Sequence, residues 1–319
     1  MPRYIDVFNG DADGLCALQQ LRLAEPVDAE LITGCKRDIA LLSRVQANAG
    51  TIVTVLDISL QRNRAALEAL LAAQVRVRYF DHHFAGDIPR SPWLEAHIDT
   101  AADACTSVIV DRSLNGRFRP WAIVAAYGDN VIATAERLAD ASALDPARRA
   151  TLRTLGESLN YNAYGEKIED LHIHPAALYR RLSSFDSPFE LAAREPIVQE
   201  LTALRAADLA NALNIAPLAD HTGYTIHRLP NEPWSRRVLG SFAHHLASTD
   251  PMRAHAVLAP NRDGTVSASV RVDAGSPVTA HAVCLPFSGG GRQSAAGIDR
   301  LSPADADVFV AAFGAIRWR

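Results

Sequence analysis

The sequence predicts an α/β protein: a doubly wound parallel sheet in its N-terminal part, then a smaller α+β domain. Three observations support this fold class. Strand-like and helix-like segments alternate in the first third, residues 104–184 are mostly helical in pattern, and strands return from about residue 222. Such alternation favours a parallel sheet with helices on both faces. We therefore expect domains at residues 1–190 and 221–319, joined by a helical linker at 191–220.

In the first third, short runs of β-branched and aromatic residues alternate with segments whose apolar residues recur three and four positions apart. The runs predict strands, and the recurring spacing predicts helices. The predicted strands are residues 4–10, 29–34, 51–57 and 75–81. The predicted helices are residues 14–24, 38–50 and 61–74.

The rest of the chain follows the same two patterns. Helices are predicted at residues 104–114, 120–139, 146–163, 175–185 and 195–213, the last of them in the linker. Strands are predicted at residues 223–229 and within 254–272. In the latter segment, NRDGT predicts a hairpin turn because Asp-Gly suits tight turns.

The 319-residue chain has a net charge of −4, which disfavours a purely electrostatic grip on long duplex nucleic acid. No apolar run is long enough to span a membrane, and the four cysteines form no CxxC pair. We therefore expect a cytoplasmic protein without a thiolate metal site. Lys36 and Lys167 are the two lysines, so arginine supplies most of the positive charge. Arginine suits phosphate binding, although genomic base composition would also enrich it.

Acidic residues and histidines follow three of the predicted strands. Asp11 and Asp13 follow the first strand. Asp57 ends the third strand, and the triplet Asp-His-His at 81–83 ends the fourth. Since the carboxyl ends of parallel strands share one edge of a sheet, where ligands bind in such folds, we expect these side chains to converge. Asp129, which closes an apolar helical stretch, can face the same edge.

Converging carboxylates repel one another unless a cation neutralises them. Carboxylates with one or two imidazoles suit Mn²⁺ or Mg²⁺ better than zinc. The alternative gives each residue a structural role, with Asp11 and Asp13 as acids at a helix N-terminus and the histidines as exposed loop residues. Four acidic or acidic-and-histidine segments, each after its own strand or helix, favour the metal site over a set of helix caps. The other histidine pairs, at 172–174 and 244–245, are expected to be structural.

The order of the motifs resembles that of a known family. The segments NGDADG (9–14), VLD (55–57), DHH (81–83) and YGDN (127–130) resemble the four motifs of the DHH phosphoesterases. The stretch GGGRQSAAG at 289–297 is similar to the GGGHxxAAG signature of that family's DHHA-type C-terminal domain. The resemblance spans nearly the whole chain and implies that the protein is an enzyme of this kind.

The resemblance implies a centre that holds two ions, either Mn²⁺ or Mg²⁺. It implies that Asp11 binds the first ion, that Asp13 binds the second, and that Asp57 bridges them. His82 and Asp129 complete the second site in this interpretation. Two such ions activate a water molecule for attack on phosphorus.

The resemblance also assigns residues to the reaction and to the substrate. His83 points at the substrate phosphate or assists proton transfer, and Asp81 orients the histidines by hydrogen bonding. The glycines and the arginine of the second domain's signature bind the substrate in this interpretation: Gly289, Gly290, Gly291 and Arg292. Apart from the resemblance, Arg271 in a predicted strand is a candidate second clamp on the phosphate, with a surface role as the alternative.

Two positions depart from the family pattern. Many members have a histidine four residues before the first aspartate, where this chain has Val7. The first metal site is therefore expected to be weak, filled only with substrate, or completed by Asn9. The family's single-strand exonucleases also lack that histidine, so its loss does not imply inactivity. Arg292 replaces the signature histidine, and it either binds phosphate as a fixed cation or pairs with an acid such as Asp299.

The expected function is hydrolysis of phosphodiester or phosphomonoester bonds in short oligonucleotides or nucleotides. The expected partner is thus a phosphate-containing small molecule or a short single-stranded nucleic acid, with no membrane and with a homodimer left open. One alternative is an exopolyphosphatase-like hydrolase. The other is a module that binds nucleotides or nucleic acid and has degenerate catalysis, for which the departures at Val7 and Arg292 are the support.

Overall fold

The computed structural model describes residues 2–318 of the chain. Internal contacts divide the chain into two compact units, of which the first ends at Ala203 and the second begins at Leu204. The division falls within α9 (Pro196–Leu213). No helix among the described residues is long and apolar enough to cross a membrane.

The first unit is built on a five-stranded sheet in the order β2-β1-β3-β4-β5. The strands are β1 (Tyr4–Asn9), β2 (Ala29–Gly34), β3 (Ile52–Leu56), β4 (Arg76–Asp81) and β5 (Leu94–Ile98). All neighbouring pairs are parallel, which confirms the predicted sheet. Phe8 pairs with Leu56, and Leu56 pairs with Phe80. The three central strands therefore end level with one another, and the residues that follow them meet at one edge.

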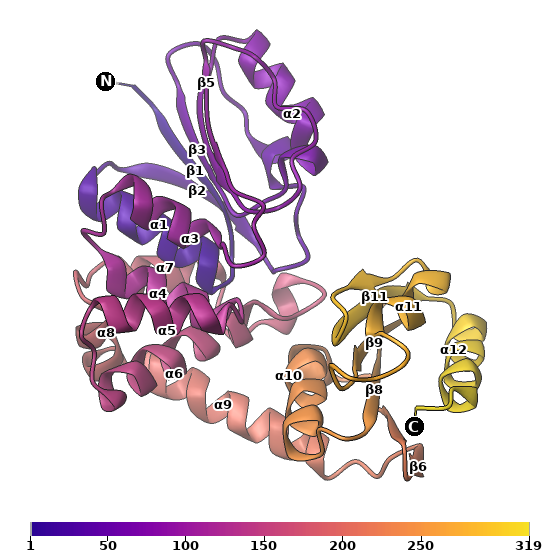
Figure 1. The fold of residues 1–319 in the computed structure, drawn as a ribbon. Helices are drawn as coiled ribbons and strands as arrows, with labels where there is room; N and C mark the ends of the chain where they lie inside the picture. Colours follow the sequence, from indigo (N-terminus) through magenta and orange to yellow (C-terminus); the bar gives the residue numbers. More distant parts are fainter. Residues whose placement is uncertain (1, 319) are drawn as a thin grey trace. The chain divides into compact units, whose positions relative to one another are not determined.

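Helices cover both faces of this sheet, as Figure 1 shows. Adjacent side chains of a strand point to opposite faces. Val7 of β1 belongs to the core beneath α2 (Leu60–Ala72), whereas Phe8 belongs to the core beneath α1 (Ala12–Ala24). The helix α3 (Thr106–Ser113) packs beside α1 and against β4. The doubly wound arrangement is thus confirmed.

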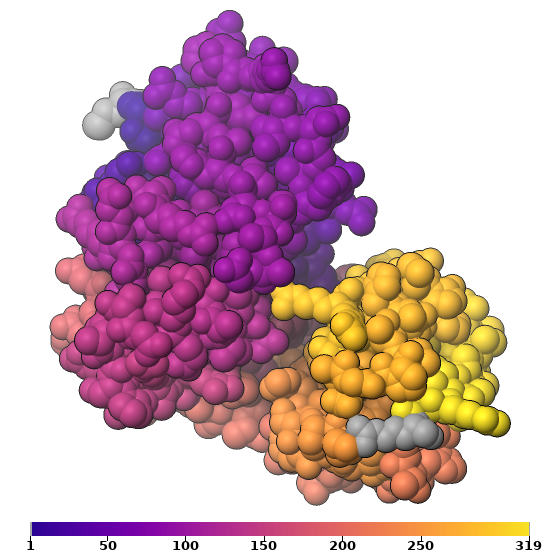
Figure 2. All heavy atoms as spheres, viewed as in Figure 1, coloured from indigo at the N-terminus to yellow at the C-terminus, as the bar shows by residue number. Residues whose placement is uncertain are grey.

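Further helices form a second layer. They are α4 (Arg119–Gly128), α5 (Ile132–Ala141), α6 (Pro146–Ala163), α7 (Pro175–Leu182) and α8 (Pro188–Arg194). In this layer α4, α6 and α7 pack on α1, α5 packs on α4, and α8 packs on α4 and α6. Figure 2 shows the outer surface of this part of the chain in purple to pink. Two glycines let α4 and α6 approach closely. A Cβ atom on Gly156 would lie 2.1 Å from the carbonyl oxygen of Val124, and one on Gly128 would lie 2.9 Å from that of Gly156.

Residues 38–50 do not form the helix that their apolar spacing predicts. Only a short 3₁₀ turn, Leu41–Arg44, is present. The Asn63 side chain on α2 accepts a hydrogen bond from the Leu42 N–H (3.2 Å) and donates one to the Ile39 carbonyl (2.7 Å). These tertiary bonds satisfy the local backbone, so the segment packs on α2 without becoming helical.

The predicted helix at residues 120–139 is in fact two helices, α4 and α5. The chain turns between them, and Asn130 has a φ of 59°. Asparagine adopts this left-handed conformation more readily than most residues. The turn leaves Asp129 as the C-cap residue of α4.

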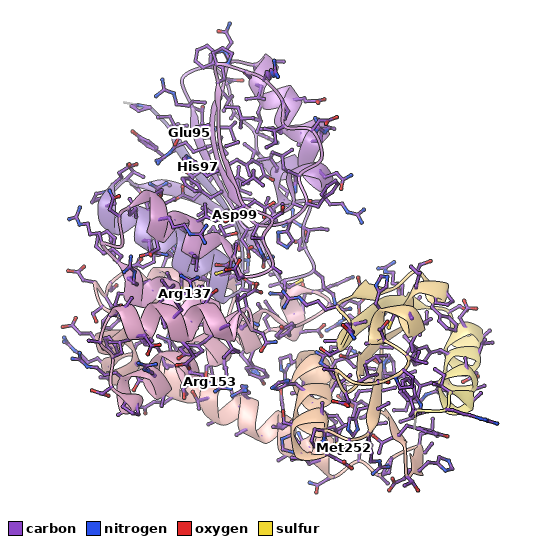
Figure 3. The ribbon with its side chains drawn as sticks, in the orientation of Figure 1. Glu95, His97, Asp99, Arg137, Arg153 and Met252 are labelled. Atoms are coloured by element: carbon purple, nitrogen blue, oxygen red, sulfur yellow. The ribbon has the colours of Figure 1, made fainter. Side chains whose placement is uncertain are left out.

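The edge strand β5 is absent from the sequence prediction. Figure 3 shows the labelled side chains of Glu95, His97 and Asp99 in succession along it and just beyond its end. The His97 ring stacks on Phe80 with a centroid distance of 4.4 Å and bonds Glu95 (2.7 Å). Charged residues on an edge strand discourage pairing with another chain, but they also hide the strand from a search for apolar runs.

The second unit contains a mixed six-stranded sheet in the order β10-β11-β9-β8-β7-β6. Its strands are β6 (Ala219–His221), β7 (Tyr224–Arg228), β8 (Ala254–Pro260), β9 (Val266–Arg271), β10 (Gly290–Gly291) and β11 (Ala295–Leu301). Its helices are α10 (Pro233–Thr249), α11 (Ala280–Cys284) and α12 (Pro303–Ala315). The buried Phe309 and Phe313 of α12 anchor its core. The predicted α+β fold is confirmed, with β8 and β9 antiparallel across the predicted turn.

Replacing Gly156 by alanine tests the α4–α6 contact. Because the added methyl would meet the Val124 carbonyl at 2.1 Å, we expect a loss of about 1–3 kcal/mol in the free energy of unfolding. Urea denaturation of the full chain measures it. Gly240→Ala, on α10, is the control: its Cβ would meet nothing within 4 Å, so stability should hold or rise. Equal effects of the two substitutions would contradict the close-contact argument.

Candidate metal centre

Asp11 begins the site, directly after β1. It is the N-cap residue of α1, and its Oδ1 accepts hydrogen bonds from the N–H groups of Asp13 (3.0 Å) and Gly14 (3.1 Å). Its Oδ2 forms an ion pair with Lys36 Nζ. The helix-cap interpretation of Asp11, which the motif order disfavours, is therefore correct for one of its oxygens. A Cβ on Gly14 would lie 2.1 Å from the Asn9 carbonyl oxygen, so only glycine fits this turn.

Asp13 is fully buried at the start of α1 and is held by the N-terminus of α3. Its two oxygens accept hydrogen bonds from the N–H groups of Thr106 and Ser107, both at 2.7 Å. The N-terminus of a helix stabilises a negative charge. Burial nevertheless raises the pKa of Asp13, and the nearby charge of Asp129 adds to the increase. The carboxylate is fixed in place before any cation arrives.

Asp57 follows β3 and has an unusual backbone. Its φ is 60°, in the left-handed region that costs energy for residues other than glycine. The Asp57 N–H donates to the Phe80 carbonyl (3.1 Å), and the Thr106 hydroxyl donates to Asp57 Oδ1 (3.1 Å). Burial and the charges of Asp11 and Asp13 raise the pKa of Asp57 well above its usual value. A cation would relieve this repulsion.

The three residues of the DHH motif lie at and just after the end of β4. His82 Nε2 is 3.4 Å from Asp57 Oδ1 and 3.8 Å from Asp129 Oδ2. His83 Nδ1 is 2.7 Å from Asp81 Oδ1, and the His83 side chain is 43% exposed while Asp81 is fully buried. Asp81 Oδ2 has no hydrogen-bond partner among the described residues. Asp81 thus orients His83, whereas the His82 ring lies beside the carboxylates of Asp57 and Asp129.

The charge of His82 is set by its neighbours. Burial opposes the protonated form, but the hydrogen bond to Asp57 and the charges of Asp57, Asp13 and Asp129 outweigh it and raise the pKa of His82 to about 10. Without a metal ion, the imidazole is therefore protonated at neutral pH. It has to lose this proton before it can bind a metal.

Two sets of these side chains converge closely enough to hold an ion. One is Asp13, His82 and Asp129, and the other is Asp57, His82 and His83; within each set the ligand atoms lie within 4.8 Å of one another. Carboxylate oxygens with imidazole nitrogen are a donor set that suits Mn²⁺, and carboxylates suit Mg²⁺. Asp11 belongs to neither set among the described residues. The donor set fits a divalent cation on the side of Asp13 and His82.

Sequence analysis missed one charged member of the site, Lys36. This residue lies two positions after β2, the neighbour of β1, and its Nζ contacts both Asp11 and Asp129 Oδ1, the latter at 3.1 Å. Although burial disfavours its charge, the nearby carboxylates of Asp11 and Asp129 raise the pKa of Lys36 well above its usual value. Two features of the sequence could have pointed to Lys36: the chain has only two lysines, and this one follows the end of a predicted strand.

The predicted substrate-binding residues belong to the second unit. Gly290 and Gly291 form β10, and a Cβ on Gly289 would lie 2.6 Å from the Gly297 carbonyl oxygen. The Arg292 N–H donates to the Ala295 carbonyl (2.7 Å). Arg292 is exposed and forms no ion pair with Asp299 or any other acid among residues 2–318. The Arg271 guanidinium donates to Ser269 Oγ (3.0 Å) and to the Val270 carbonyl (2.9 Å).

The histidines at 172 and 174 have structural partners. His172 Nε2 is 2.7 Å from the Tyr161 hydroxyl. His174 Nδ1 accepts a hydrogen bond from the Ala176 N–H (3.1 Å) and so caps α7. Both contacts agree with the structural role expected for this pair.

Solved structures share this fold over the whole chain. The chain matches exonuclease RecJ bound to manganese with a TM-score of 0.59 and 18% identity, covering all of this chain and 91% of that one. It matches RecJ with Mn²⁺ from Thermus thermophilus with a TM-score of 0.61 and 20% identity over 98% of this chain and 52% of that one, about half its length. The pGpG-specific phosphodiesterase PggH from Vibrio cholerae matches with a TM-score of 0.54 and 14% identity, covering 98% and 97% of the two chains.

The resemblance to the DHH phosphoesterases is therefore confirmed at the level of the fold. At these identities, the match defines the class of fold and not the activity of this chain. No protein-family model and no curated protein matches the sequence. Two of these RecJ structures contain Mn²⁺, and a further RecJ structure from Thermus thermophilus contains Mg²⁺.

Manganese binding should release a proton from His82. Since its pKa is about 10 in the metal-free protein, the affinity for Mn²⁺ should rise with pH up to that value, by up to about tenfold per pH unit for each proton released. Calorimetric titration in buffers of different ionisation enthalpy measures the protons released. His82→Asn should abolish this proton release and weaken binding, whereas His281→Asn, on α11, should change neither. Binding that does not vary with pH would exclude His82 as a ligand.

Proposed function

We propose that the protein is a metal-dependent phosphoesterase that hydrolyses phosphodiester or phosphomonoester bonds of short oligonucleotides or nucleotides. The observation on which this proposal rests is the convergence of Asp13, Asp57, His82 and Asp129 at the carboxyl edge of the parallel sheet. The fold shared with RecJ and PggH gives the proposal its reaction class.

These four residues would hold the cation. When bound, Mn²⁺ or Mg²⁺ lowers the pKa of a water molecule and offsets the charge of the phosphate. Asp13 is fixed by the N-terminus of α3, and Asp57 by Thr106, so neither has to reorganise during the reaction. The resemblance implies a second ion beside Asp11.

His83 is the residue that we assign to proton transfer. Its Nδ1 faces Asp81, so its Nε2 is left to hold or move a proton at the substrate. A carboxylate that orients an imidazole in this way is a recurrent feature of acid–base catalysis. The half-exposed ring of His83 can reach an incoming phosphate, while the buried Asp81 cannot.

A short substrate fits the available observations better than a long duplex. The net charge of −4 disfavours a purely electrostatic grip on a long duplex. PggH, a pGpG-specific phosphodiesterase, matches this chain over nearly the full length of both proteins. In the second unit, we assign phosphate binding to Arg292 with the glycines at 289–291, as the resemblance implies, and to Arg271 as a second clamp.

The experiment that tests this function is a panel of substrates with Mn²⁺. The panel comprises a linear dinucleotide such as pGpG, a cyclic dinucleotide, a 5′-phosphorylated single strand, phosphoadenosine phosphate and short polyphosphate. We expect turnover of the linear dinucleotide, and its loss when a chelator is added. Turnover of polyphosphate alone would favour the exopolyphosphatase alternative. Binding of Mn²⁺ without turnover of any substrate would favour the binding module.

Asp57→Asn should reduce hydrolysis by at least about a hundredfold, because the neutral amide is a poor ligand for a hard cation. Asparagine tolerates the left-handed backbone at this position, so the thermal unfolding midpoint should change little. Asp307→Asn is the control: Asp307 lies on α12 of the second unit and pairs with Arg228. An Asp57→Asn variant as active as the original chain would refute the metal assignment.

A further inference from the structure

The cation that lies beside Asp11 is part of the chain itself. Lys36 Nζ pairs with Asp11 Oδ2 and is 3.1 Å from Asp129 Oδ1, so it bridges two of the predicted metal ligands. The side chain is 28% exposed, so most of it lies within the site. A bridging ammonium offsets the repulsion between the two carboxylates, as a divalent ion would.

Several contacts fix Lys36 in this position. Its N–H donates to the Ala163 carbonyl (3.0 Å), and its carbonyl accepts from Asn9 Nδ2 (3.4 Å). The Tyr164 ring lies below the ammonium, with its centroid 5.8 Å from Nζ, within reach of a cation–π interaction. The contact between Lys36 and the carboxylates is thus supported by the backbone as well as by charge.

While Lys36 is in place, Asp11 has no free oxygen for a divalent ion, and neither position 7 nor position 9 supplies a ligand in its stead. Asp11 Oδ1 already accepts from two backbone N–H groups, and its Oδ2 is paired with Lys36. Val7, at the position where many DHH proteins have a histidine, is fully buried in the core beneath α2. Asn9, the expected substitute, uses its Oδ1 to accept from the Asp11 N–H (3.3 Å) and its Nδ2 to donate to Lys36. The described residues therefore do not fit a metal ion beside Asp11 unless Lys36 is removed, which frees Asp11 Oδ2.

We propose that Lys36 replaces the first metal ion, so that the centre binds one divalent cation, on the side of Asp13 and His82, and not two. This inference rests on the proposed function and corrects the ion count that the resemblance implies. A second divalent ion beside Asp11 would lie against the ammonium, and the like charges would repel. Lys36 is a positioning residue in this scheme: it holds Asp11 and Asp129 together without binding the metal.

The chain offers a matched control for a direct test, because its other lysine, Lys167, is exposed and lies after α6. Mn²⁺ bound at saturation is counted by titration of the chelator-stripped full chain, followed by electron paramagnetic resonance of the free ion. The original chain, Lys36→Met and Lys167→Met are compared. In parallel, amine labelling followed by mass spectrometry reports the reactivity of each lysine with and without Mn²⁺.

We expect one Mn²⁺ ion per original chain and per Lys167→Met chain, and two per Lys36→Met chain. Lys36 should label more slowly than Lys167, and Mn²⁺ should not speed its labelling. Two ions in the original chain, with Lys36 becoming reactive when Mn²⁺ is added, would overturn this inference alone. A Lys36→Met chain that still takes one ion would also overturn it. No bound ion in the original chain would overturn the proposed function itself. If Lys36→Met does not fold, the ion count and the labelling of the original chain decide.

Discussion

The level ends of β1, β3 and β4 are the constraint on which the site depends. Parallel pairing aligns Phe8, Leu56 and Phe80, so the residues that follow these strands have to meet at one edge of the sheet. Two unit charges 4 Å apart repel by about 4 kcal/mol at an effective dielectric constant of about 20. Carboxylates brought together in this way destabilise the fold unless other groups offset their charge. The rest of the site supplies those groups.

Each carboxylate has a different source of compensation. The N-terminus of α3 donates two backbone hydrogen bonds to Asp13. Asp11 accepts hydrogen bonds from the N-terminus of α1 and also forms an ion pair with Lys36. Asp57 has a hydroxyl donor and His82 beside it, but it retains a left-handed backbone and a raised pKa. The incompletely compensated charge therefore lies around Asp57 and His82. This is where a bound cation would stabilise the protein most.

Local sequence signals failed wherever tertiary contacts decided the outcome. Residues 38–50 have a helical apolar spacing, but hydrogen bonds from Asn63 hold them in another conformation. The edge strand β5 is too polar for a strand pattern, and it forms because β4 offers it a partner. The helix predicted at 120–139 is split by a turn at Asn130. In the metal centre, the acids and histidines were found because each follows a strand or helix, whereas Lys36 stands apart from any motif.

By itself, the sequence determined the fold class, the central strands of the first sheet and the residues that meet at the sheet edge. These follow from apolar periodicity and from the rule that parallel strands end on the same side. Only the tertiary structure decided how charge is distributed among those residues. Whether Asp11 meets a metal ion or an ammonium depends on where the Lys36 backbone is held by Ala163, which is 127 positions away along the chain (163 − 36). Contacts between segments so far apart in the sequence are set by packing and hydrogen bonding in the folded chain. No local sequence pattern records them.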